Sequence, residues 1–300
     1  MKVLVTGPDG FVGRHLCDRL AAEGHEVVQA PGPGSEEGVD IRDATRLGAL
    51  LHSVRPHAVV HLAAASSVGR SHRDPVETLD VNAVGTTALL SAARRAAPDS
   101  RLLIIGSGEV YGRASSETPA DETTPLEPLS PYAASKAAAE LVALQFHRSY
   151  GTNVVCVRAF SHLGRGQAQD FAIPSFAAQL AAIKRGEAPP VLRTGDLSPV
   201  RDFLHVADVA RAYELLMRVG VAGSVYNVAS GTGRSIRSLL DEMLALSKIN
   251  ARVEVDPARL RPVEIPVLIG NPSRLTALGW KPQYELSAAL RDVLEEQGAL

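Results

Sequence analysis

The sequence predicts an α/β fold: a doubly wound parallel sheet with helices on both faces, joined by a smaller mixed α/β lobe. Two observations predict the parallel sheet. Short apolar strand patterns alternate with helical ones over the first half, and a glycine-rich turn follows the first strand. Continuous apolar strands separated by helices are typical of parallel sheets covered on both sides. The second lobe is predicted because this alternation loosens after about residue 160.

The expected strands are short and rich in β-branched residues, and the expected helices carry apolar residues at helical spacing. Strands are expected at 2–6, 25–30, 57–64, 101–106, 153–160 and 224–230, and helices at 11–24, 43–54, 75–97, 130–151 and 234–247. Segment 190–216 is predicted to form a turn, a short strand and a helix. We expect 1–160, with return segments near 190–230, to form a Rossmann unit. Residues 161–300 then form an interleaved second lobe that binds substrate.

Composition excludes several classes of protein. The 300 residues include 31 Lys and Arg against 33 Asp and Glu, so bulk charge suggests no nucleic-acid or anionic-membrane surface. The apolar runs are far shorter than the ~20 residues of a membrane span. The opening MKVLVTG enters a strand without a signal-peptide pattern, so a cytoplasmic protein is expected. Cys17 and Cys156 are predicted to be reduced core thiols, and no metal-binding motif is present, so no metal is expected.

A dinucleotide site is predicted from TGPDGFVG, which lies between the first strand and the first helix. Gly7, Gly10 and Gly13 permit a tight turn and a close approach of the backbone to a pyrophosphate. The N–H groups of the helix that begins at Phe11 and Val12 then face the phosphates. The alternative is a structural turn without a ligand.

The sequence leaves NAD and NADP open, with NADPH favoured. The second strand ends in QAPG, with neither the acid that reads a ribose 2′-hydroxyl nor the arginine that accommodates a 2′-phosphate. Asp40 and Ile41 are suited to flank the adenine, although Asp40 could equally be a loop residue that begins the next helix. Arg42 is a candidate for reaching a 2′-phosphate.

A catalytic pair is predicted in YAASK, where Tyr132 and Lys136 share one face of a helix. An ammonium group beside a phenol lowers its pKa, and the phenol can then exchange a proton with a carbonyl or alcohol oxygen. Ser107, in GSGEVYG at the end of the fourth strand, could hydrogen-bond the same oxygen. Tyr111 in this stretch is expected to pack or to line the site.

Five motifs together resemble the extended short-chain dehydrogenase/reductases that act on nucleotide sugars: TGPDGFVG, HLAA, VNAVGT, GSGEVYG and SPYAASK. The resemblance covers essentially the whole chain. Within this family, RAFSHLGRGQ, VRDFLHVADVARAY and RPVEIPVLIGNPSRLTALGWKP are similar to the GDP-mannose branch. That branch contains reductases of GDP-6-deoxy-4-keto-D-mannose and, as near relatives, GDP-mannose 4,6-dehydratases.

The resemblance implies further roles and a partner. Leu62, Ala63 and Ala64 would contact the cofactor, and Asn82 would help to order the site near the tyrosine. A homodimer is implied, in which the helices at 75–97 and 130–151 pair into a four-helix bundle. The small residues of AASKAAAELVALQF suit such close packing, although a helix buried on two sides would look the same.

The substrate side is predicted from charged and polar residues of the later segments. Arg201 could clamp a diphosphate bidentately, or form a surface ion pair. The resemblance implies that Arg261 and Glu264 contact the nucleoside ribose. Ser161 stands where relatives have asparagine, and His162 follows it as a substrate residue or as a packed loop histidine.

The stretch GSGEVYG decides between two reactions. A 4,6-dehydratase has a threonine, then Asp or Ser, then Glu; Ser107, Gly108 and Glu109 stand here, so the middle side chain is missing. We therefore expect NAD(P)H-dependent reduction of the C4 ketone of a GDP-4-keto-6-deoxyhexose, with Tyr132 as proton donor. The product would be GDP-D-rhamnose or its C4 epimer. The alternatives are a 4,6-dehydratase with Glu109 as base, an epimerase, and a catalytically idle dinucleotide-binding scaffold.

Overall fold

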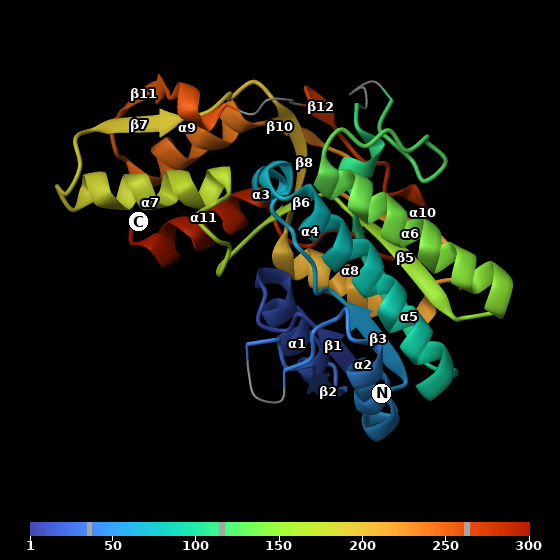
Figure 1. The fold of residues 1–300 in the computed structure, drawn as a ribbon. Coiled ribbons are helices and arrows are strands. Elements are labelled where there is room, and N and C mark those ends of the chain that lie inside the picture. Colours follow the sequence, from blue (N-terminus) through green and yellow to red (C-terminus); the bar gives the residue numbers. More distant parts are fainter. Residues whose placement is uncertain (35–37, 114–117, 261–264) are drawn as a thin grey trace.

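A six-stranded parallel sheet is formed by five strands from the first 160 residues and one later strand (Figure 1). The computed structural model describes residues 1–34, 38–113, 118–260 and 265–300. The strands run in the order β2 (Glu26–Gln29), β1 (Lys2–Thr6), β3 (Ala58–His61), β4 (Arg101–Ser107), β5 (Val154–Ala159) and β9 (Val225–Val228). The chain leaves β1 toward β2 and returns to β3 on the other side of β1. A crevice at the carboxyl ends of β1 and β3 follows from this reversal.

Helices cover both faces of the sheet, which confirms the predicted fold class. One face carries α1 (Phe11–Ala22) and α8 (Val206–Val219), and the other carries α2 (Ala44–Val54), α5 (Gly85–Ala96) and α6 (Pro131–Tyr150). Within β1, Val3 and Val5 belong to the first apolar cluster and Leu4 to the second. This alternation between two buried faces is why the strands read as continuous apolar runs. Cys17 and Cys156 are free and buried, one in each cluster.

The helix predicted at 75–97 is interrupted. Residues form α4 (Pro75–Leu79), a π-helical turn η1 (Asp80–Val84) and then α5. A π turn accommodates an extra residue in a helix and is frequent at functional sites. Asn82 lies in this turn and is buried. The short helix α3 (Val68–Arg73), which precedes α4, was not predicted.

A second group of elements packs beside the sheet, and Figure 1 shows α7, α9 and α11 gathered with β7 and β11 at one end of the molecule. Its elements are β6 (Ser161–Leu163), α7 (Ala172–Lys184), β7 (Val191–Thr194), β8 (Val200–His205), β10 (Gly233–Ser235), α9 (Ile236–Ser247), β11 (Arg252–Val255), η3 (Pro257–Arg259), β12 (Val267–Leu268) and α11 (Leu286–Gln297). The short helix α10 (Ser273–Thr276) packs on β9, and its Leu275 belongs to the core of the first sheet. Along the chain between β8 and β10, the helix α8 and the strand β9 return to the first sheet. The division into 1–160 and 161–300 remains a prediction.

Candidate active site

A cavity of about 700 Å³ opens where the strand ends of the first sheet meet the later segments. It brings together most of the predicted residues: Gly7, Gly10, Phe11, Val12, Gly13, Leu62, Ala63, Ala64, Ser107, Glu109, Tyr132, Lys136, Ser161, His162 and Arg201. Residues from far apart in the sequence therefore line a single space. Across the described ranges, no group of three or more His, Cys, Asp or Glu residues could hold a metal ion. Nor is any helix in those ranges long and apolar enough to cross a membrane.

The turn after β1 leaves no room for side chains at two of its glycines. Gly7 has a positive φ of 70°, and a β-carbon there would lie 2.8 Å from the Ala63 nitrogen. A β-carbon at Gly13 would lie 2.2 Å from the Gly7 carbonyl oxygen. Backbone therefore lines this end of the cavity, at the N-terminus of the twelve-residue helix α1. This arrangement fits the diphosphate of a dinucleotide, which such turns cradle with N–H groups.

Asp40, Ile41 and Arg42, which were expected near the adenine, are not among the residues that line the cavity. Arg42 is held by three carboxylates, with closest contacts of 2.6 Å to Asp40, 2.9 Å to Asp80 and 3.2 Å to Glu77. Hydrogen bonds from Arg42 lower the pKa of Asp40. The side chain of Ile41 contacts the start of α5. The structure thus gives Arg42 protein partners, and its role toward a 2′-phosphate stays a prediction.

Tyr132 and Lys136 lie one turn apart at the start of α6, which Ser130 caps by accepting a hydrogen bond from the Ala133 N–H at 3.1 Å. Burial raises the pKa of Tyr132 to about 12, opposed by a hydrogen bond with Ser107. Burial lowers the pKa of Lys136 to about 8. The lysine Nζ donates to the Ile105 carbonyl oxygen at 2.8 Å. The expected lowering of the phenol pKa by Lys136 is therefore wrong for this structure, because desolvation of the phenol dominates.

The stretch from Ser107 to Glu109 turns sharply as β4 ends and the short 3₁₀ helix η2 (Gly108–Tyr111) begins. The Ser107 hydroxyl accepts a hydrogen bond from the Glu109 N–H at 3.2 Å and caps the turn. A β-carbon at Gly108 would lie 3.0 Å from three atoms of the Phe160 ring. Phe160 is itself confined, because a β-carbon at Gly270 would lie 2.5 Å from the same ring. A side chain at position 108 would therefore fit only if this buried ring gave way by a few tenths of an ångström.

Asn82 hydrogen-bonds residues that neighbour the cavity lining along the chain. Its Oδ1 accepts from the Ala65 N–H at 2.8 Å, and its Nδ2 donates to the Ala65 carbonyl at 3.0 Å and to the Ser135 hydroxyl at 2.8 Å. These bonds tie the loop after β3 to α6, between Tyr132 and Lys136. Asn82 is not among the residues that line the cavity. Its geometry therefore suits the ordering role better than direct contact with a cofactor.

The opposite end of the cavity is lined by polar side chains. Arg201 lies in β8, is only 7% exposed, and donates to the Val200 carbonyl at 2.9 Å. His162 donates from Nδ1 to the Phe160 carbonyl at 2.9 Å and stacks on Phe11. Burial lowers the pKa of His162, which favours the neutral ring with Nε2 as an acceptor. Ser161 lines the cavity beside it, whereas Arg261 and Glu264 lie outside the described residues.

Sequence reasoning missed several lining residues at this end. They are Phe171, Ser175, Gly195, Asp196 and Arg259. Arg259 donates to the Ser175 hydroxyl at 3.2 Å, and its backbone approaches Gly195 so closely that a β-carbon there would lie 2.7 Å from the Arg259 carbonyl oxygen. A signal for Arg259 was available, because it stands two residues before the predicted Arg261.

Comparison with known proteins places the chain in a family. The family model described as GDP-mannose 4,6 dehydratase matches residues 37–293. GDP-6-deoxy-D-mannose reductase from Pseudomonas aeruginosa is 38% identical over 297 residues, which cover 98% of this chain and 96% of the relative. A UDP-glucose 4-epimerase from Rhizobium meliloti is 33% identical over 316 residues, covering 96% of this chain and 94% of the relative.

Solved structures show the same likeness. RMD from Pseudomonas aeruginosa complexed with NADPH superposes with a TM-score of 0.90 at 37% identity, covering 99% of each chain. UDP-glucose 4-epimerase from Thermus thermophilus in complex with NAD gives a TM-score of 0.88 at 33% identity, again over 99% of each chain. The glycine turn, the Tyr132–Lys136 pair and the match of the family model agree, and the chain belongs to the GDP-mannose 4,6-dehydratase family.

Proposed function

We propose that this protein reduces the C4 ketone of a GDP-4-keto-6-deoxyhexose with NAD(P)H, in a reaction of the GDP-4-keto-6-deoxy-D-mannose to GDP-D-rhamnose type. The observation that carries the proposal is the packing of Phe160 against Gly108. A dehydratase needs a side chain at this position in addition to a carboxylate base. Gly108 has none, and a β-carbon there would lie 3.0 Å from the Phe160 ring. The name of the relative from Pseudomonas aeruginosa, a reductase, supports the same reaction.

Tyr132 is suited to donate the proton. Its pKa of about 12 keeps the hydroxyl protonated at neutral pH, which is the state that a ketone reduction consumes. Ser107 interacts with this hydroxyl and would hydrogen-bond the same substrate oxygen. As the carbonyl carbon accepts a hydride, the oxygen gains negative charge and takes the proton from Tyr132.

The cofactor site is built from the turn between β1 and α1, with Leu62, Ala63 and Ala64 alongside. When bound, a reduced nicotinamide supplies the hydride. Lys136 would contact its ribose. NADPH is the favoured form because a relative of 37% identity binds it. Arg42 is not proposed as the 2′-phosphate ligand, because Asp40, Glu77 and Asp80 engage it.

The sugar nucleotide is proposed to occupy the end of the cavity lined by Arg201 and Arg259. Arginine guanidinium groups bind phosphate oxygens bidentately and keep their charge at any working pH. Ser161 and His162 would contact the sugar, and Arg261 and Glu264 the nucleoside ribose. Which C4 epimer forms depends on the face of the ketone that is turned toward the nicotinamide.

A 4,6-dehydratase is the second candidate, and Glu109 is the observation that favours it. Its carboxylate is close enough to Tyr132 to add to the rise in the pKa of the phenol. A base that removes the C5 proton would also have to lie near Tyr132. The description of the family model agrees with this reaction. The buried ring beside Gly108 argues against it.

A homodimer is proposed through α4, η1, α5 and α6, which lie together in Figure 1 and pack on one another. Their outer surface carries five exposed large apolar residues: Val76, Leu79, Val84, Leu141 and Tyr150. Pairing with a second copy would bury them in a four-helix bundle. Sedimentation analysis is expected to show a dimer, and Leu141→Glu a monomer. A monomeric wild type at micromolar concentration would contradict the proposal.

The reaction is tested by incubating the protein with NADPH or NADH and GDP-4-keto-6-deoxymannose while following the loss of reduced cofactor. Oxidation in step with loss of the keto-sugar is expected. Formation of a 4-keto product from GDP-mannose without added reduced cofactor would overturn the proposal in favour of the dehydratase.

A further inference from the structure

Arg158 is a buried arginine that the proposed reaction does not use. It lies in β5, is 5% exposed, and faces α6. Its Nε and Nη2 donate to the two carboxylate oxygens of Glu140 at 2.8 and 2.6 Å, and its Nη1 donates to the Tyr111 hydroxyl at 2.8 Å. Glu140 is 3% exposed and Tyr111 is 1% exposed. We call these three side chains the Arg158 cluster.

A gain in folding stability does not by itself explain why this buried cluster is charged. A buried ion pair loses hydration on both charges, and well-packed apolar side chains of similar volume are often as stable or more stable. What charges and bidentate hydrogen bonds do supply is a fixed geometry between the segments that carry them.

Each member lies on an element that carries part of the cavity wall. Glu140 is on α6, one turn beyond Lys136 and two turns beyond Tyr132, so it shares their face of the helix. Arg158 pairs in the sheet with Gly106, the residue before Ser107. Tyr111 ends η2, the turn that begins at Gly108.

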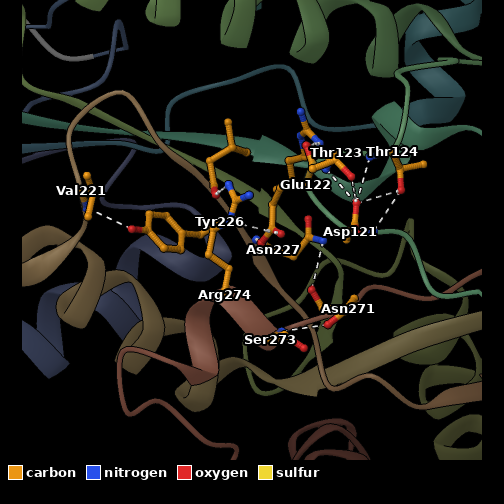
Figure 2. A network of polar contacts seen from close by, with 12 residues as sticks. Asp121, Glu122, Thr123, Thr124, Val221, Tyr226, Asn227, Asn271, Ser273 and Arg274 are labelled. Atoms are coloured by element: carbon orange, nitrogen blue, oxygen red, sulfur yellow. Dashed lines mark hydrogen bonds and ion pairs between the residues drawn. The ribbon is translucent and has the colours of Figure 1, made fainter.

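Further contacts anchor the cluster to the rest of the sheet. The Tyr111 hydroxyl donates to Asn227 Oδ1 at 2.7 Å, and the Asn227 N–H donates to a carboxylate oxygen of Glu122 at 2.8 Å. Figure 2 shows Asn227 at the centre of this network, with Glu122, Asn271 and Arg274 around it. Arg274 approaches the Glu122 carboxylate to 3.6 Å and donates to the Val225 carbonyl at 3.0 Å. The network holds the far side of Tyr111 to β9.

The cluster also reaches the cavity by packing. The Tyr111 ring stacks on Phe160 with ring centres 6.0 Å apart, and Phe160 is the side chain that closes the space beside Gly108. Moving Tyr111 would therefore release Phe160, and moving Glu140 would shift α6 against β5. Both movements change the separation of Ser107 from Tyr132.

We propose that Glu140, Arg158 and Tyr111 are positioning residues that lock α6 and η2 to β5, so that the hydroxyls of Ser107 and Tyr132 meet on one substrate oxygen. None of the three is among the residues that line the cavity, so they would act through Ser107, Phe160 and Tyr132. The proposal rests on the C4 chemistry of Tyr132, which reductase and dehydratase share.

The test compares two variants, Tyr111→Phe and the double variant Glu140→Leu/Arg158→Met. Both avoid leaving a single buried charge without its partner. A displacement of about 1 Å at reacting groups lowers rates by about 100-fold. We therefore expect kcat to fall about 10- to 100-fold in the double variant and less in Tyr111→Phe. The KM for the sugar nucleotide and the dissociation constant of reduced cofactor stay near wild type.

Arg211→Met is the matched control. Arg211 forms a 2.6 Å ion pair with the buried Asp208 on α8, and the Gln283 and Tyr284 N–H groups still satisfy that carboxylate when the arginine is removed. It should lower the thermal midpoint without changing kcat. Glu140→Asp, which keeps the charge on a shorter side chain, should also lower kcat.

The proposal is overturned if the double variant keeps wild-type kcat, or if its loss appears in cofactor affinity and thermal stability with kcat per folded molecule unchanged. Each variant is measured with whichever C4 reaction the wild type catalyses. A failure of the reductase proposal is then visible in the wild type, whereas a failure of this inference is visible only in the variants.

Discussion

The two ends of the cavity are lined in different ways. At the dinucleotide end, backbone atoms of the turn after β1 approach one another and the segment after β3 so closely that Gly7 and Gly13 have no space for a β-carbon. At the opposite end, side chains from β6, β8, α7 and η3 converge, among them Arg201 and Arg259. Tyr132 and Ser107 lie between the two.

This difference predicts a separate kind of damage for each end and a third for the residues between them. Substitutions at the dinucleotide end act by overlap with backbone, so they disturb the turn itself and cofactor affinity with it. Substitutions at the side-chain end remove a charge from an otherwise intact wall, so they change the KM for the sugar nucleotide. Changes between the ends should affect kcat alone.

The largest effect is expected between the two ends, from Tyr132→Phe. Loss of a positioned general acid costs about 10²- to 10⁴-fold in rate, and kcat should fall by that amount. Cofactor titration by fluorescence should stay near wild type, because the aromatic ring remains. Turnover close to wild type would show that another group donates the proton.

Gly13→Ala tests the backbone end. The added methyl group meets the Gly7 carbonyl oxygen, so the turn must open; overpacking of this kind costs about 1–3 kcal/mol of folding stability. Thermal unfolding and cofactor titration should both show the loss. Gly48→Ala is the control, because that α2 glycine has nothing within 4 Å and the change should stabilise the helix by about 0.5–1 kcal/mol. Equal effects at both glycines would refute the overlap account.

Arg259→Ala tests the side-chain end. A hydrogen bond to a charged group contributes about 1.5–3 kcal/mol, so the KM for the sugar nucleotide should rise by roughly 10- to 100-fold while kcat is retained. Arg237→Ala, on an exposed pair with Asp241, should change neither. A fall in kcat with unchanged KM would place Arg259 in the chemistry and not in phosphate binding.

The pH profile separates Lys136 from both ends. Its pKa of about 8 means that the ammonium is present below pH 8 and is lost as the pH rises through that value. If the charge holds the cofactor ribose, kcat/KM for the cofactor should fall above about pH 8. Lys136→Arg keeps the charge at higher pH. Its kcat/KM for the cofactor should be lower than that of the wild type but should no longer fall as the pH rises. A fall that persists in Lys136→Arg would belong to another titrating group.

The smallest effect is expected for Arg42→Ala. Three carboxylates engage this guanidinium, so its removal should leave the KM for NADPH and for NADH within about threefold of wild type, in the range of weak exposed ion pairs. A large rise in KM for NADPH with NADH unchanged would show that Arg42 reads the 2′-phosphate after all.

The dinucleotide end could be read from the sequence because its signal is local. TGPDGFVG and YAASK each hold their functional residues within a few consecutive positions. The strands of the sheet are likewise predicted from continuous apolar runs. The π turn around Asn82 has no comparable local signal, because it arises where the helix packs on α6.

The side-chain end was read less completely. Phe171, Ser175, Asp196 and Arg259 come from segments that tertiary packing alone brings together. The raised pKa of Tyr132 was also missed, because spacing along a helix shows that Lys136 is near but does not show how deeply the phenol is buried.

The reductase assignment is tested most directly with reduced cofactor that carries deuterium at both hydrogen positions of nicotinamide C4, given to the protein with GDP-4-keto-6-deoxymannose. The account predicts one deuterium at C4 of the product sugar for each cofactor oxidised. A dehydratase returns its hydride within the sugar, so the contrary result is a 4-keto product made from GDP-mannose with no deuterium from added cofactor.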